Sequence, residues 1–391
     1  MRSKLPGAPT SIFAVMSGLA REHNAINLSQ GFPDFDLSPE LIELMDKNMR
    51  QGNNQYAPMP GVEPLREEIS VKIKRDYGKF YNPETEINIT AGATQALFTA
   101  FNTFVFPGDE VIVIEPAYDS YIPSIILNGG KPVPIPLTEN FRYDWDQIRS
   151  AITPKTRMIV INSPHNPLGT IFHEEDITAL TEITRGTDIL ILSDEVYEHI
   201  IFDGKTHLSM AKYPELADRS LVISSFGKTF HATGWKVGYI AGPAKYIAEF
   251  RKIHQFTVFA VNTPAQMSYS EFLKNPENYL HLNEFYQNKR DFLNSFFTNT
   301  KLKFTPAEGT YFQIFDYSEY SDEDDFTFSK RLTAEAGTAV IPLSPFYTVD
   351  YSGKKIRVCF AKKNGILKEG AERVLEYLRT SELQNPGTSV T

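Results

Sequence analysis

The chain has 391 residues, of which 41% are hydrophobic and 22% are charged. This length suggests two or three domains that each bury a core, and the composition is typical of a globular protein rather than a disordered or fibrous one. The net charge of −9 leaves no broad basic surface for a phosphate backbone, so nucleic acid is not expected as a partner.

The sequence indicates neither an oxidising compartment nor a membrane. Cys359 is the only cysteine, so no internal disulfide and no cysteine metal cluster can form. No apolar run approaches the ~18 residues that span a bilayer. Pro6, Gly7 and Pro9 interrupt the N-terminal stretch that faintly imitates a signal peptide. We therefore expect a cytoplasmic protein without membrane contact, whose first residues form an ordered arm.

The first two thirds of the chain alternate helical patterns with short apolar runs. Ser38 followed by Pro39 predicts a helix that ends near Arg50. Further helices are expected at residues 61–79, 93–105, 118–127 and 174–185. Apolar runs of strand length lie at residues 87–90, 110–114, 157–162, 189–193 and 221–224. Such continuous runs suit a parallel sheet covered on both faces, so this part is predicted to be α/β.

The pattern changes after Asn262, where one long helical stretch is predicted to continue to residue 297. Strands are then expected at residues 304–315, 339–342 and 355–360, and helices at residues 325–336 and 366–378. The acidic run at residues 322–325 is interpreted as a solvated loop and helix start, and residues 382–391 as a frayed tail. These elements predict an N-terminal arm (1–37) that joins a small α+β domain (286–391), with a large domain (38–285) between them.

Several motifs of known chemistry are incomplete. Gly227-Lys228-Thr229 resembles the end of a phosphate-binding P-loop, but Val222 stands where the first glycine is required. His165 and His199 have no second ligand at metal spacing, so no metal site is expected. No serine-nucleophile elbow is present either.

One group of polar residues remains, at the ends of three predicted strands. Lys228 follows the strand at 221–224, and polar segments follow two others, at residues 162–169 and 193–197. Carboxyl ends of parallel strands meet at one sheet edge, where ligands bind in α/β proteins. Each residue alone has an ordinary explanation: Lys228 as a surface lysine, Asp194 as a helix cap, and Asn166-Pro167 as a turn.

Taken together, these motifs resemble a family. The segments are Asn27 to Asp34, Asn166-Pro167-Leu168-Gly169, Asp194-Glu195-Val196-Tyr197, Ser225-x-x-Lys228 and Gly234-x-Lys236-x-Gly238. In order and spacing they are similar to the class I/II aminotransferases that use pyridoxal 5′-phosphate, over nearly the whole chain to Arg357. The similarity is greatest to the branch of methionine aminotransferase, kynurenine aminotransferase and glutamine transaminase K. It implies fold-type I: a mostly parallel central sheet with helices on both faces in a large cofactor-binding domain, and a smaller α+β domain.

The resemblance implies two catalytic residues and three further cofactor contacts. Lys228 would hold the cofactor as a Schiff base and carry the proton of the substrate α-carbon. Asp194 would keep the pyridine nitrogen protonated, so that the ring accepts electrons. Asn166 and Tyr197 would hydrogen-bond the phenolic oxygen of the cofactor, and Tyr118 would stack on the ring.

The resemblance also implies a phosphate site and a second subunit. Gly92, Ala93 and Thr94 lie between a strand and a helix N-terminus, and Ser225 and Lys236 would complete the anion site. Lys236 replaces the arginine of aspartate aminotransferases, a departure shared by the kynurenine branch. Tyr56 resembles the tyrosine that reaches the phosphate of the neighbouring subunit, which implies a homodimer. Local packing before a helix is the alternative for Tyr56.

Substrate contacts are implied for Arg357, Gly31, Asn166 and Phe13. Arg357 stands in an apolar strand and would bind the substrate α-carboxylate with its forked donors, whereas a buried ion pair with an acid of the protein is the alternative. Phe13 and Phe259 are candidate walls of the side-chain pocket, or else plain core or interface residues.

The implied reaction is transfer of an amino group between an amino acid and a 2-oxo acid by ping-pong half-reactions. Residues 256–262, the segment comparable to the one that supplies a second arginine for aspartate, contain no Lys or Arg. Methionine is therefore the first expected donor, with aromatic residues and glutamine next. Kynurenine aminotransferase and cysteine-S-conjugate β-lyase are the alternatives on this scaffold. A cofactor-binding transcriptional regulator would need an added DNA-binding domain, for which too few residues precede Asn27.

Overall fold

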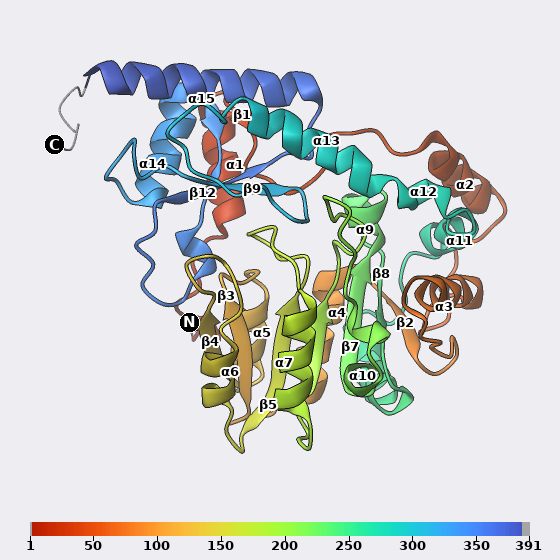
Figure 1. Cartoon of the computed structure of the whole chain (residues 1–391). Helices are drawn as coiled ribbons and strands as arrows, with labels where there is room; N and C mark the ends of the chain where they lie inside the picture. The colour runs from red at the N-terminus through yellow and green to blue at the C-terminus, as the bar shows by residue number, and fades with distance from the viewer. Residues whose placement is uncertain (1, 385–391) are drawn as a thin grey trace.

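The computed structural model describes residues 2–384. Its centre is a seven-stranded sheet of order β2-β8-β7-β6-β5-β3-β4 (Figure 1). The strands are β2 (Ile87–Thr90), β3 (Glu110–Glu115), β4 (Lys131–Pro136), β5 (Thr156–Asn162), β6 (Leu190–Asp194), β7 (Ser220–Ser225) and β8 (Gly238–Ala241). All are parallel except β8, which runs antiparallel to both of its neighbours. The mostly parallel sheet confirms the predicted fold class.

Helices cover both faces of this sheet. They do so because each central strand points apolar side chains to both faces. Val111 and Val113 of β3 belong to the cluster that packs under α4, α5 and α10, whereas Ile112 and Ile114 belong to the cluster of α6 and α7. The bounds are α4 (Ala93–Phe104), α5 (Tyr121–Leu127), α6 (Trp145–Ala151), α7 (Glu174–Thr184) and α10 (Ala244–Thr257). In Figure 1, α7 lies in front of the sheet and α4 lies behind it.

A smaller α+β region lies above the large sheet in Figure 1. Its antiparallel sheet has the order β11-β12-β9, and β1 near the N-terminus pairs in parallel with β10. The strands are β1 (Ile26–Asn27), β9 (Phe312–Asp316), β10 (Thr338–Ala339), β11 (Ile341–Pro342) and β12 (Lys355–Cys359). The helices are α1 (Ile12–Glu22), α14 (Asp325–Arg331) and α15 (Asn364–Gln384). The N-terminal segment is thereby attached to the C-terminal region.

The remaining helices flank these two regions, and none in the described part of the chain is long and apolar enough to cross a membrane. They are α2 (Pro39–Arg50), α3 (Glu63–Tyr77), α8 (Pro214–Ala217), α9 (Phe226–Thr229), α11 (Thr263–Phe272), α12 (Glu277–Leu280) and α13 (Leu282–Ser295). Short 3₁₀ turns lie at η1 (Met210–Lys212), η2 (Thr233–Trp235) and η4 (Ser344–Phe346), and a π-helical turn, η3 (Leu332–Ala336), follows α14.

Three predictions of local structure are wrong. The long helix to residue 297 is three helices, since Pro276 cannot continue a helix and α12 begins directly after it. The strand expected at 304–315 begins only at Phe312, because Pro306 and Gly309 favour a loop and Thr310 has a φ of 64°. The helix expected at 325–336 is confirmed in its bounds, with α14 over residues 325–331 and the π-helical turn over residues 332–336. The frayed tail was placed too early, because α15 extends to Gln384; residues 385–391 lie outside the described residues.

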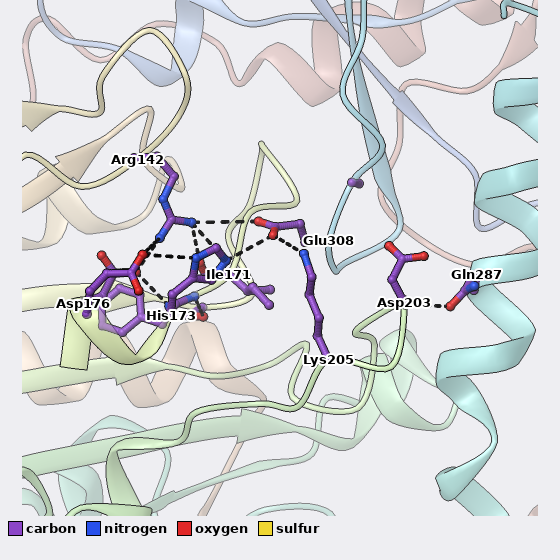
Figure 2. Close-up of polar contacts among 12 residues, drawn as sticks. Arg142, Ile171, His173, Asp176, Asp203, Lys205, Gln287 and Glu308 are labelled. Atoms are coloured by element: carbon purple, nitrogen blue, oxygen red, sulfur yellow. Dashed lines mark hydrogen bonds and ion pairs between the residues drawn. The ribbon is translucent and has the colours of Figure 1, made fainter. Parts of the chain in front are cut away.

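The loop before β9 joins the small region to the large sheet. The backbone N–H groups of Glu308 and Gly309 donate to the carbonyl of Gly169 at 2.8 and 2.9 Å. The Glu308 carboxylate accepts from Lys205 Nζ at 2.6 Å and lies 3.2 Å from Nε2 of His173, as Figure 2 shows. Arg142 completes this ionic cluster through Asp176 at 2.8 Å. The loop is therefore fixed to segments that follow the central strands.

Candidate active site

A cavity of about 160 Å³ opens where β5, β6 and β7 end. Asn162 and Asp194, the last residues of β5 and β6, are direct neighbours in the sheet register. Its lining residues are Ala93, Thr94, Leu97, Tyr118, Asn162, Asn166, Asp194, Val196, Tyr197, Ser225, Gly227, Lys228, Thr233 and Lys236. All the predicted cofactor contacts except Gly92 and Tyr56 therefore line one cavity.

One end of the cavity is a site for an anion. Gly92 has a φ of 77°, and α4 begins at the next residue with its first N–H groups unpaired within the helix. A Cβ at Gly92 would lie 3.2 Å from Nζ of Lys236, so the lysine amine lies against the helix N-terminus. Ser225 lines the same cavity from the end of β7. A helix N-terminus, an ammonium and a hydroxyl are donors that suit a phosphate.

Another polar group of the cavity is the Asp194 carboxylate, which is only 4% exposed. Burial raises the pKa of Asp194 to about 6, although hydrogen bonds from Tyr121 Oη at 2.7 Å and from the Val196 N–H at 3.4 Å act in the other direction. None of the ion pairs within residues 2–384 includes Asp194. A protonated pyridine nitrogen would supply the cation that this carboxylate lacks, so the site fits pyridoxal 5′-phosphate.

Lys228 enters the cavity from α9, directly after β7. Its Nζ lies 3.0 Å from Oη of Tyr311 and 3.3 Å from the carbonyl oxygen of Gly31. Burial lowers the pKa of Lys228 to about 8, and the positive charges of Arg357 and Lys236 act in the same direction. The amine therefore loses its proton more readily than an ordinary lysine, which favours attack on a carbonyl.

Asn166 and Tyr197 offer hydrogen-bond donors between the lysine and the arginine of the site. The Asn166 N–H donates to Oδ1 of Asn162 at 2.7 Å, and its own Oδ1 accepts from Arg357 at 2.8 Å. The Nδ2 group of Asn166 is therefore left to donate elsewhere. Burial raises the pKa of Tyr197, so its hydroxyl stays protonated and can donate as well.

Arg357 on β12 is 1% exposed and is held by neutral groups. Its guanidinium donates to Asn166 and, at 3.1 Å, to the Ser29 carbonyl, while Nε has no partner among the described residues. The guanidinium carbon lies 3.9 Å from the ring centroid of Phe312 and 5.3 Å from that of Phe13. No acid within residues 2–384 forms an ion pair with Arg357. An unsatisfied buried guanidinium suits a ligand carboxylate.

Tyr56 and Phe259 lie outside this cavity in the single chain. Tyr56 is 84% exposed, and its ring centroid lies 5.5 Å from that of Phe259. Tyr56 lines a separate surface cavity of about 560 Å³ together with residues 260–264. Phe13, by contrast, lies beside Arg357, and the carbonyl of Gly31 contacts Lys228.

Besides some lining residues of the cavity, four residues that contact the predicted ones were not predicted from the sequence. Tyr121 donates to Asp194, Tyr311 contacts Lys228, and Phe312 and Phe346 enclose Arg357. A tyrosine or phenylalanine in an apolar stretch gives no signal of this kind, because the same residue serves equally well in a core. Only Tyr121 stands within a few residues of a predicted contact, Tyr118.

Comparison with known proteins gives matches over almost the whole chain. The sequence profile of the family described as aminotransferase class I and II matches residues 23–374. The methionine aminotransferase of Escherichia coli (strain K12) is 48% identical over 375 residues, which cover 95% of this chain and 97% of that protein. Kynurenine–oxoglutarate transaminase 1 of Homo sapiens is 32% identical, with 92% and 94% covered. A crystal structure of a methionine aminotransferase from Escherichia coli superposes with a TM-score of 0.94 at 47% identity, covering 96% of this chain and 99% of the other.

Proposed function

Because the chain belongs to the class I and II aminotransferases, which act through pyridoxal 5′-phosphate, we propose that its preferred amino donor is methionine or another bulky neutral amino acid. The amino group would pass to a 2-oxo acid in two ping-pong half-reactions. The observation that carries this proposal is the environment of Arg357. Its guanidinium is a single cation among the aromatic rings of Phe13, Phe312 and Phe346. This surrounding can bind one carboxylate and offers apolar contact to the rest of the substrate.

An acidic side chain would need a second cation, and the sequence offers none in the expected place. Residues 256–273 contain no Lys or Arg. Burying an uncompensated carboxylate costs several kcal/mol, whereas an apolar side chain gains about 0.8 kcal/mol for each buried methylene. The 48% identity to a methionine aminotransferase supports the same donor.

We propose the following division of work among the residues of the cavity. The bound cofactor supplies an acceptor for the electrons that remain when the substrate α-carbon loses its proton. Lys228 bonds to the cofactor and, when released, takes and returns this proton. Asp194 keeps the pyridine nitrogen protonated, and Asn166 and Tyr197 donate hydrogen bonds to the phenolic oxygen.

The other contacts position the cofactor and the substrate. Tyr118 would stack on the ring, and the Arg357 fork would hold the α-carboxylate next to Asn166 and Gly31. The phosphate would be held by these groups: Gly92, Ala93 and Thr94 at the start of α4, with Ser225 and Lys236.

We further propose that the active form is a cytoplasmic homodimer in which Tyr56 serves the partner's phosphate. The high exposure of Tyr56 and its distance from the cavity of its own chain support this arrangement. Cys359 is buried and unpaired, which agrees with a reducing compartment. In this proposal the chain is divided into an arm (1–37), a large cofactor-binding domain (38–285) and a small domain (286–391).

The test is a visible absorption spectrum of the cofactor-loaded protein during addition of single amino acids. Methionine should deplete the band of the lysine-bound cofactor at the lowest concentration, followed by aromatic residues and glutamine, and a 2-oxo acid should restore the band. A stronger response to kynurenine would favour a kynurenine aminotransferase, and release of a thiol from a cysteine S-conjugate would favour a β-lyase. A response to aspartate that exceeds all others would overturn the proposal.

A further inference from the structure

The amine of Lys228 lies against two oxygen atoms to which the proposed division of work assigns no contact with this amine. These are Oη of Tyr311, at 3.0 Å, and the carbonyl oxygen of Gly31, at 3.3 Å. The amine also lies 5.5 Å from the ring centroid of Tyr197 and 5.6 Å from that of Tyr311. Gly31 belongs to the N-terminal segment and Tyr311 to the loop before β9, so the two oxygens come from outside the large sheet that carries Lys228.

The direction of the hydrogen bonds between these groups is fixed by their chemistry. The Tyr311 hydroxyl donates its one proton to the Gly31 carbonyl at 2.7 Å. It can therefore only accept from Lys228, and the carbonyl can only accept as well. Burial raises the pKa of Tyr311 far above its usual value, so the hydroxyl remains neutral and keeps this arrangement.

Tyr311 is held in place by the loop that precedes it. The preceding loop is bonded to the large region, because Thr310 N–H donates to the Ile200 carbonyl and Phe202 N–H donates to the Glu308 carbonyl, both at 2.9 Å. The Glu308 side chain adds the ion pair with Lys205 that Figure 2 shows. Tyr311 itself is fully buried. Its hydroxyl is thus a fixed acceptor and not a mobile side-chain group.

The Gly31 carbonyl is fixed in a similar way. A Cβ at position 31 would lie 2.6 Å from Cζ of Phe312, so a larger residue would push this segment away from Lys228. Phe312 is also the ring that stacks on Arg357, at 3.9 Å. The acceptor pair therefore lies next to the expected site of the substrate carboxylate.

We propose that Tyr311 is a positioning residue whose hydroxyl, together with the Gly31 carbonyl, holds the Lys228 amine whenever that amine is not bonded to the cofactor. The proposal rests on the assignment of Lys228 as the amine that binds the cofactor. It adds that the released amine has a defined resting place, so that it stays near the substrate α-carbon between taking and returning the proton.

The proton balance of this step is simple. When the α C–H bond of the substrate breaks, its electrons would stay with the substrate and the bound cofactor, and the neutral Lys228 amine would take the proton in a new N–H bond. The resulting ammonium donates to Tyr311 and Gly31, and it becomes neutral again when it returns the proton. Tyr311 gains and loses no proton in this sequence. Burial and the neighbouring cations lower the pKa of Lys228, so they disfavour the ammonium. A neutral hydrogen-bond acceptor stabilises the ammonium and therefore offsets part of this effect.

The test compares Tyr311→Phe with a matched control, Tyr286→Phe. Tyr286 is equally buried, its ring centroid lies 5.7 Å from that of Tyr311, and its hydroxyl has no partner among the described residues. Both variants remove one buried hydroxyl from the same aromatic cluster. Thermal unfolding of each cofactor-free variant shows that its fold is retained.

The first readout is the pKa of Lys228 in the cofactor-free protein, taken from the pH dependence of its rate of reaction with added pyridoxal 5′-phosphate. Tyr311→Phe should lower this pKa by about one unit, and Tyr286→Phe should leave it unchanged. This readout uses no amino acid, so it stands even if the proposed donor preference fails. If borohydride attaches the cofactor to another lysine in the wild-type protein, the underlying assignment fails instead.

The second readout is the rate of a single half-reaction with methionine and with α-deuterated methionine. Tyr311→Phe should slow this step about tenfold or more and increase the deuterium isotope effect, since proton transfer becomes slower than the other steps. Tyr286→Phe should match the wild type. An unchanged Lys228 pKa or an unchanged isotope effect in Tyr311→Phe would overturn the proposal.

Discussion

The environment of Asp194 suits its proposed chemical role but lowers the stability of the fold. Its carboxyl is buried without a cationic partner among the described residues, and burial raises its pKa to about 6 from an ordinary value of 3.8. The neutral carboxyl is thus favoured in the fold below pH 3.8, and this advantage is lost as the pH rises through 6. Ionised Asp194 therefore destabilises the cofactor-free protein at neutral pH.

Asp194→Asn should stabilise the cofactor-free protein above pH 6, by about 3 kcal/mol for a shift of about two pKa units. The difference from wild type should vanish below pH 4, where both side chains are neutral. Chemical denaturation at pH 4 and at pH 7.5 measures both values. A variant that is less stable than wild type at pH 7.5 would contradict the burial argument.

The same substitution should abolish most of the activity. A neutral amide cannot keep the pyridine nitrogen protonated, so we expect Asp194→Asn to bind cofactor and to lose kcat by orders of magnitude. Cofactor content by absorbance and kcat under saturating donor measure this. Near-normal kcat with bound cofactor would exclude the proposed role.

Lys228→Ala should remove the covalent attachment of the cofactor and nearly all turnover while the fold stays intact. The amine is the proposed nucleophile, with a lowered pKa at the carboxyl edge of the sheet, and alanine leaves no substitute there. Borohydride reduction of the wild-type protein followed by peptide mapping identifies the attached residue. Cofactor on a lysine other than Lys228 would contradict the assignment.

At the scale of elements, Glu308 joins the loop before β9 to the large region. Burial acts to raise its pKa, but the hydrogen bonds and charges of Lys205 and His173 outweigh this and hold the pKa below its usual value. The stabilisation that follows is present above pH 4.5 and is lost as the pH falls through the lowered pKa. The Glu308 side chain is 19% exposed, so solvent screens part of this interaction.

Glu308→Gln should therefore lower the free energy of unfolding by about 1 kcal/mol at pH 7, and the loss should shrink as the pH falls below 4.5 and through the lowered pKa of Glu308. The matched control is Glu319→Gln, which removes a more exposed ion pair with Lys303. The control should change stability by less than about 0.5 kcal/mol. Equal effects of the two substitutions would show that the ionic cluster of Figure 2 has no special role.

The strands also show which parts of the fold can be predicted from sequence patterns. The strands β3, β5, β6 and β7 were predicted within a residue or two, because each is a continuous apolar run between two helices. The strand β8 was not predicted, since it begins with Gly238 and forms no continuous run of large apolar residues. Gly238 is nevertheless required, because a Cβ there would lie 2.6 Å from the Ser224 carbonyl. Long-range pairing, and not local preference, makes this segment a strand.

The sequence likewise predicted the site residues that stand in local motifs and missed those that only long-range packing brings to the site. Lys228, Asp194 and Asn166 stand in motifs of fixed spacing, so their common location follows from strands that end at one edge. Tyr311 and Phe346 reach the same place from the far end of the chain, and no local pattern links them to it. Only the packing of the small region against the sheet brings them together.

On the scale of the whole molecule, the exposed aromatic residues predict where a second copy binds. Phe256 is 85% exposed and lies in the same part of the chain as Phe259, which contacts Tyr56. Large exposed apolar side chains grouped in this way mark interaction surfaces. The surface cavity beside Tyr56 belongs to the same region.

Phe256→Asp should convert the proposed homodimer to monomers and weaken cofactor binding at the same time, because Tyr56 would then lose its place at the partner's phosphate. Light scattering and cofactor titration measure the two effects together. Phe106→Asp is the control: Phe106 is 59% exposed and follows α4, whose Phe104 contacts Tyr246 near the start of α10, whereas Phe256 stands near the end of that helix, so the dimer should persist. A fully active wild-type monomer would contradict the proposed assembly.

The most direct measurement of the central claim is the ratio of kcat/KM for methionine to kcat/KM for aspartate in the wild-type enzyme. Arg357 offers one cation in aromatic surroundings, and an unpaired distal carboxylate there costs several kcal/mol. We predict a ratio of about 100 or more in favour of methionine. A kcat/KM for aspartate that equals or exceeds the value for methionine would contradict the account.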